Sequence, residues 1–95
     1  DVPDVPRQEL RELERRGVLF ERDGRWFHID ALEIAGHLAA SLLVDAPGGF
    51  GVSQFREAAG ITRKHAVPLV SELDARAFTR RRGDVHIGGP RLPSG

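Results

Sequence analysis

Two short basic stretches carry most of the chemistry that this sequence offers. Arginine and lysine at close spacing bind phosphate groups, and arginine does so through a planar fork of N–H donors. A helix that began near residue 63 would add free backbone N–H groups and the positive end of its dipole. The stretches therefore form a candidate nucleic-acid site, whose residues are Thr62, Arg63, Lys64, His65, Arg80, Arg81, Arg82, Gly83, Asp84 and His86.

The charge distribution supports a polyanionic partner. The 95 residues contain 14 Lys and Arg against 14 Asp and Glu, so the whole chain is neutral. Residues 61–95, however, hold seven basic and three acidic residues, a net charge of +4, and residues 1–60 hold −4. A local concentration of cations attracts polyanions even when the total charge is zero.

Catalysis and metal binding find little support in the sequence. It lacks cysteine, which excludes disulfides, thiolate nucleophiles and cysteine–zinc sites and fits a reducing cytosol. The histidines, His28, His37, His65 and His86, are widely separated, so none forms the close pair of a helix-borne metal site. Phosphate-binding glycine loops and the nucleophile elbow are missing as well. We therefore expect no enzyme, no metal and no cofactor in this chain.

The first thirty residues predict a helix followed by a hairpin. Strong helix formers occupy residues 7–16, and Gly17 is a typical helix stop. The apolar runs 18–22 and 25–29 flank Asp23-Gly24, a pair that favours a two-residue hairpin turn.

The rest of the chain predicts helix, helix, turn, helix and hairpin. Asp30 and Glu33 have the spacing of a capping box for a helix that reaches about residue 44. Further helices are expected over residues 53–59, capped by Ser53, and 63–76, capped by Thr62, with Pro68 as a kink. Strands at 78–82 and 85–87 then flank a turn at Gly83-Asp84.

An internal repeat relates the two hairpin regions. Glu12, Leu13, Arg16 and Arg22 recur, at one constant offset, as Glu72, Leu73, Arg76 and Arg82. The duplicated order predicts an α+β, helix-rich winged-helix fold, with a helix-turn-helix unit and a β-hairpin wing. We expect residues 30–88 to be a complete winged helix, residues 1–29 to be the end of a preceding one in a longer protein, and residues 89–95 to be a flexible tail.

These patterns leave the partner open. A basic helix-turn-helix unit with a basic wing indicates nucleic acid without choosing between DNA and RNA. One alternative is the DNA-binding winged helix of a transcription regulator, and another is a protein-binding spacer.

The sequence resembles the C-terminal region of bacterial selenocysteine-specific translation elongation factors, the SelB family. The resemblance covers about residues 7–90 and is densest over residues 55–87. It rests on four strings, which are Phe55-Arg56-Glu57, Gly60-Ile61-Thr62-Arg63-Lys64-His65-Ala66-Val67-Pro68-Leu69, Leu73-Asp74 and Thr79-Arg80-Arg81-Arg82-Gly83-Asp84. The family usually has glycine where Ala77 stands and a basic residue where His86 stands. Ala77 is therefore expected in a strained conformation or with a different helix cap.

What the resemblance implies is specific. Members have a GTPase body followed by four winged helices, and the last one binds an mRNA hairpin, the SECIS element, that recodes UGA as selenocysteine. Arg63, Lys64 and residues 80–84 would hold the hairpin backbone and an extruded loop base. GTP, the ribosome and selenocysteyl-tRNA would engage parts of the protein outside this chain. The resemblance also implies a cytoplasmic monomer that does not bind membranes.

Overall fold

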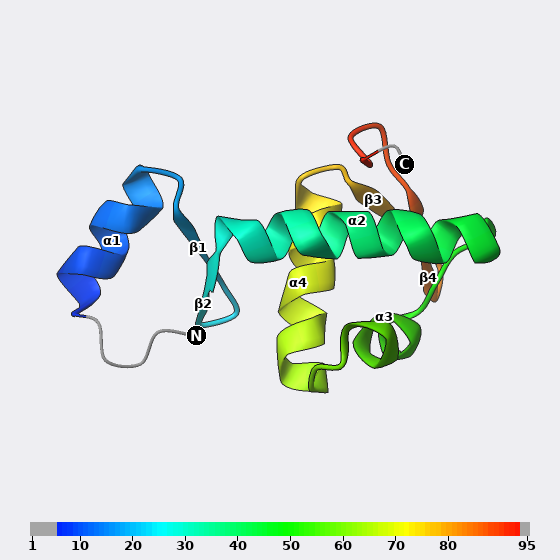
Figure 1. The fold of residues 1–95 in the computed structure, drawn as a ribbon, viewed down its shortest axis with the longest axis horizontal. Helices are drawn as coiled ribbons and strands as arrows, with labels where there is room; N and C mark the ends of the chain where they lie inside the picture. The colour runs from blue at the N-terminus through cyan, green and yellow to red at the C-terminus, as the bar shows by residue number, and fades with distance from the viewer. Residues whose placement is uncertain (1–5, 94–95) are drawn as a thin grey trace.

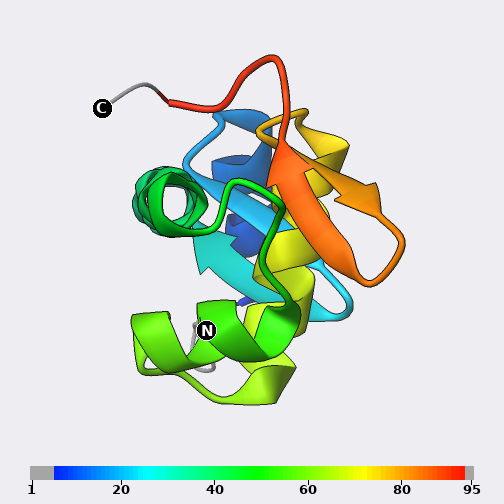
Figure 2. The same ribbon diagram turned by 90° about the vertical axis from the view of Figure 1, so that its right-hand side faces the viewer.

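The computed structural model of the chain describes residues 6–93 and shows three helices packed around one core, with a hairpin on either side (Figures 1 and 2). A further helix lies beyond the first hairpin, at the N-terminal end of the molecule (Figure 1). In chain order the elements are α1 (Arg7–Arg15), β1 (Leu19–Arg22), β2 (Arg25–His28), α2 (Ile29–Asp45), α3 (Val52–Ala59), α4 (Arg63–Ala75), β3 (Thr79–Arg82) and β4 (Val85–Gly88).

Helices α2, α3 and α4 with the β3–β4 hairpin form a winged helix, as the sequence predicts. The short connection from α3 to α4 begins at Gly60, whose φ of 68° supplies the left-handed helix end. The centre of the core holds Phe50 and Phe55 with Leu32, Val70 and Leu73, each at most 2% exposed. Apolar residues three and four positions apart on α4 face this core, so the opposite side of α4 faces solvent.

The β1–β2 hairpin belongs to the same core although it precedes the winged helix in the chain. Phe20 and Phe27 stack with ring centroids 5.3 Å apart and pack in the central cluster. The Arg76 guanidinium lies 5.3 Å from the centroid of Phe20, and Arg22 approaches Glu72 at 3.6 Å. Side chains from both sides of the expected boundary at residues 29 and 30 thus share one core, and the division into domains stays a prediction.

The internal repeat appears in the backbone as well as in the sequence. After α1, Val18 N–H donates to Leu13 O at 3.0 Å, and after α4, Phe78 N–H donates to Leu73 O at the same distance. Both hairpins have four-residue strands in the same register, with Leu19 opposite His28 and Thr79 opposite Gly88. Each of these contacts in the first unit has its counterpart at the equivalent position of the second, so the two helix–hairpin units are built alike.

Ala77 adopts the strained conformation, the first of the two alternatives expected from the family resemblance. Its φ is 65°, and the counterpart in the repeat, Gly17, has a φ of 77°. The hydrogen bonds from Ala77 and Phe78 to the carbonyls of Asp74 and Leu73 form a Schellman motif, which requires a left-handed residue. Alanine meets this requirement at a steric cost that glycine avoids.

Two predicted helix caps are wrong. Helix α2 begins one residue before Asp30, and its first turn is capped by His28, whose Nδ1 accepts from Asp30 N at 3.0 Å. Helix α3 begins at Val52, one residue before Ser53, after Gly51 as the N-cap residue. In each case the residue predicted as the cap lies inside the first turn of the helix. A capping side chain must come from the residue before that turn, where it can accept from the free backbone N–H groups.

Residues 89–93, which the sequence assigns to a flexible tail, contact the rest of the chain, and the flexibility of the tail stays a prediction. Gly89 N–H donates to Phe78 O at 3.0 Å, Arg91 N–H donates to Ala77 O at 2.9 Å, and Leu92 packs against the core. A Cβ at Gly89 would lie 2.4 Å from Ala77 O, so glycine permits this close approach. Residues 94 and 95, like residues 1–5, lie outside the described residues.

Candidate nucleic-acid interface

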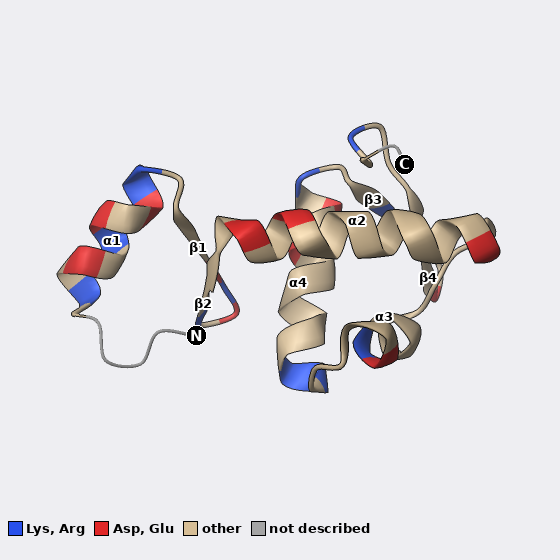
Figure 3. Cartoon of the chain, in the orientation of Figure 1, with Lys and Arg blue, Asp and Glu red and all other residues tan. Residues whose placement is uncertain are grey.

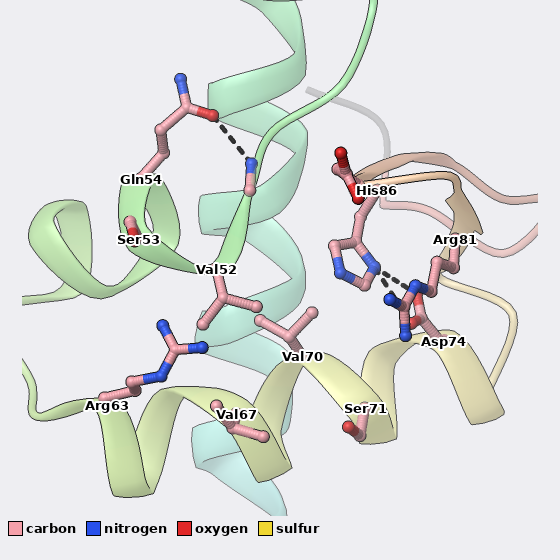
Figure 4. A pocket seen from close by; sticks show the side chains of 12 residues that line it. Val52, Ser53, Gln54, Arg63, Val67, Val70, Ser71, Asp74, Arg81 and His86 are labelled. Atoms are coloured by element: carbon pink, nitrogen blue, oxygen red, sulfur yellow. Dashed lines mark hydrogen bonds and ion pairs between the residues drawn. The ribbon is translucent and has the colours of Figure 1, made fainter.

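A cleft of about 510 Å³ opens between α3, α4 and the β3–β4 hairpin, which we call the wing (Figure 4). Polar and charged side chains from all three elements line it together with a few valines. These elements meet here because α4 packs on α3 through the core and the wing follows α4 after a tight turn. The lining residues are Gly51, Val52, Ser53, Gln54, Arg63, Val67, Val70, Ser71, Asp74, Arg81, Asp84 and His86.

Arg63 and Arg81 bring the two basic stretches together across this cleft. Arg63 is the first residue of α4, and Arg81 lies on β3, yet both line the cleft and point into it (Figure 4). Both residues are exposed. The Arg81 side chain is steadied by its own wing turn, since Nε donates to Gly83 O at 3.1 Å. Two exposed guanidinium groups facing one cleft form a site for phosphate or another anion.

The remaining predicted cations extend this site without lining the cleft. Lys64 is exposed on the first turn of α4, and Arg80 and Arg82 are exposed on β3. Figure 3 shows basic residues at the start of α4 and on β3. Because side chains alternate along a strand, Arg80 and Arg82 lie on the face opposite Arg81. The wing therefore offers cations on both faces. Gly83 at its tip has a φ of 64° and open space where a Cβ would be.

The side chains of Thr62 and His65 contact each other at the start of α4. Thr62 is the N-cap residue, but its Oγ1 lies 3.0 Å from His65 Nδ1 instead of capping a backbone N–H. Burial, followed by the nearby charges of Arg25 and Lys64, lowers the pKa of His65 below its ordinary value of 6.5. The lowered pKa favours the neutral form of His65 near pH 7. His65 can contribute a hydrogen bond, or contact through its ring.

His86 lies in the inner wall of the cleft and is buried, with 7% of its surface exposed. Its Nδ1 is 3.0 Å from each carboxylate oxygen of Asp74 (Figure 4). Asp84 is exposed and lines the same cleft. Both residues are therefore at the predicted site, but the His86 ring is directed at a carboxylate rather than outward.

Sequence reasoning missed Asp74 and the polar residues of α3. Asp74 lies in the last turn of α4, and its Oδ1 also accepts from Thr79 Oγ1 at 2.6 Å. Ser53 was predicted only as a helix cap, and Gln54 was given no role. The sequence signal that could have found Asp74 is its spacing from Arg63 and Val70, which places all three along one side of α4. Within residues 6–93, His, Asp and Glu form no group suited to a metal ion.

Comparison with known proteins agrees with this geometry. Residues 42–87 match the family model described as elongation factor SelB, winged helix. This part of the chain is therefore similar to a SelB winged helix in sequence. The matched segment contains α3, α4 and the wing, and hence the whole cleft. The family model is that of a third winged helix, whereas the sequence resemblance implies the last of four, so the ordinal position stays a prediction.

A solved structure extends the likeness to the first hairpin. The mRNA-binding domain of Escherichia coli elongation factor SelB, determined in complex with SECIS RNA, is similar in fold with a TM-score of 0.75. The two chains are 26% identical, and the match covers 87% of this chain and 69% of the other. None of the curated protein sequences matches the chain. Among residues 6–93, no helix combines the length and apolar character that crossing a membrane demands.

Proposed function

We propose that this SelB-type winged helix binds an mRNA hairpin of the SECIS class and so directs the recoding of UGA as selenocysteine. The observation that carries the proposal is the convergence of Arg63 and Arg81 on one cleft, from two separate stretches of the sequence. The similar E. coli domain, which was solved with SECIS RNA, supports RNA as the polyanion.

The geometry suits a folded RNA better than an unstructured strand. Single-strand binders stack successive bases on exposed aromatic side chains. Here Phe50, Phe55 and Phe27 are buried in the core, and the cleft is lined by polar and charged groups with a few valines. A hairpin presents both a shaped phosphate backbone and loop bases that can leave the stack. The cations of α4 and the wing would hold that backbone, and the cleft has room for a base.

The other expectations belong to the same proposal. We assign binding rather than catalysis to this chain, and place GTP, the ribosome and selenocysteyl-tRNA on other parts of a longer, cytoplasmic elongation factor. The chain itself would act as a monomer, since one cleft with its flanking cations presents a complete surface to one hairpin.

A salt titration tests whether phosphates are the contact. Five cations, namely Arg63, Lys64, Arg80, Arg81 and Arg82, surround the site. If each meets one phosphate, the logarithm of affinity should fall with the logarithm of salt concentration with a slope of roughly −3.5 to −4.5. Fluorescence anisotropy with a labelled UGA-adjacent hairpin from a selenoprotein message provides the measurement. An affinity that does not change with salt would instead favour the protein-binding spacer.

A further inference from the structure

One carboxylate holds both strands of the wing at its base. Asp74, in the last turn of α4, accepts a hydrogen bond from Thr79 at the start of β3 and faces His86 on β4. Thr79 is fully buried and His86 is 7% exposed, while Asp74 retains some contact with solvent in the cleft. A buried polar group left without its partner is costly, so each of these contacts strongly favours one placement of its strand.

The same histidine also connects the wing to the loop before α3. The backbone N–H and C=O of His86 exchange hydrogen bonds with Phe50, at 2.8 and 3.0 Å. At Gly49, next to Phe50, a Cβ would lie 2.7 Å from Val85 and 3.0 Å from His86 O, so this loop approaches β4 as closely as glycine allows. The base of the wing is therefore attached to α4 through Asp74 and to the core through Phe50.

These contacts determine where Arg81 points. Arg81 is paired with His86 in the register of β3 and β4, and paired residues of an antiparallel ladder project on the same face. That face is turned toward the cleft, as Figure 4 shows for both side chains. The contact between His86 and Asp74 thus fixes the orientation of the wing. In this orientation, the face that carries Arg81 is turned toward Arg63.

We propose that Asp74 is a positioning residue for RNA binding: it holds the wing so that Arg81 faces Arg63 across the cleft. This inference rests on the proposed function. A positioning role and simple electrostatics predict opposite changes in RNA affinity when Asp74 is removed. A carboxylate near a polyanion repels it, so removing the charge alone should strengthen RNA binding. If Asp74 positions Arg81, removing it weakens RNA binding.

The first arm of the test is a double-mutant cycle on hairpin RNA binding. Asp74→Ala should weaken affinity about tenfold, the coupling expected inside one hydrogen-bond network, and should have little effect once Arg81 is alanine. The matched control is Asp45→Ala, which removes the same charge from an exposed position at the end of α2. Affinity equal to or above that of the unmodified chain, or losses that simply add, would overturn the proposal.

The second arm needs no RNA, so it separates this inference from the proposed function. In Asp74→Ala, the amides of Phe50 and His86 should exchange with solvent faster, while amides in the centre of α2 keep their protection. Unchanged protection at Phe50 and His86 would show that Asp74 does not hold the wing, whether or not the chain binds RNA. Should Asp74→Ala fail to fold, Asp74→Asn keeps the size and one acceptor oxygen, and it should show the same changes to a smaller degree.

Discussion

Arg81→Ala is expected to weaken binding of a UGA-adjacent hairpin RNA by about 1–3 kcal/mol, the size of a well-aligned hydrogen bond between charged groups. Arg81 is exposed, projects into the cleft and is oriented by its bond to Gly83 O, so little else competes for its guanidinium. Isothermal titration calorimetry at fixed salt measures the loss.

The control for Arg81 is Arg15→Ala. Arg15 is a more distant arginine on α1, with 71% of its side chain exposed and Glu12 as its ion-pair partner. Arg15→Ala changes the net charge by the same amount as Arg81→Ala. The small effect expected of Arg15→Ala on RNA affinity therefore measures the contribution of net charge alone. Equal losses for the two variants would mean that the RNA is attracted by total charge and not by the cleft.

Phe27→Ala should destabilise the whole molecule by about 3–5 kcal/mol, as removal of a buried aromatic ring typically does. Phe27 is 6% exposed, stacks on Phe20 and meets the His65 ring edge-on with centroids 6.3 Å apart. Because the first hairpin shares the core of α2 and α4, the loss should appear in one cooperative transition. Urea unfolding followed by circular dichroism and by the fluorescence of Trp26 measures it.

A matched surface change calibrates that result. Val44 is 80% exposed on α2, so Val44→Ala should alter the free energy of unfolding by less than about 0.5 kcal/mol. If Phe27→Ala instead melts the Trp26 signal alone and leaves the helical signal unchanged, the first hairpin is an independent unit, and the shared core has no energetic role.

Local chemistry in the sequence was sufficient for most of the fold. Asp23-Gly24 predicts its turn because both residues need positive φ, and they have 55° and 77°. The strain at Ala77, by contrast, was one of two alternatives that followed from the family resemblance, in which glycine usually occupies this position. Helix starts were less predictable, because several residues near each start can cap it and packing selects among them, as His28 does for α2.

The cations of the site could be predicted from the sequence, whereas the residues that hold the wing in place could not. Arg63 and Arg81 were found from charge and spacing alone, since exposed basic clusters leave a clear trace in a sequence. Asp74 was missed because its role comes from Thr79 and His86, which approach it only after the chain has turned. His86 was expected to face the RNA for the same reason, since a sequence shows a side chain's chemistry without its surroundings.

A comparison of a UGA-adjacent stem-loop RNA with a duplex DNA of equal length, at one salt concentration and in the same anisotropy assay, tests whether cations from α4 and the wing form one surface for a folded RNA. We expect the hairpin RNA to bind at least about tenfold more tightly, because non-specific phosphate contacts alone would serve both nucleic acids. Equal affinity for the two would contradict the account and favour a general nucleic-acid or DNA-binding winged helix.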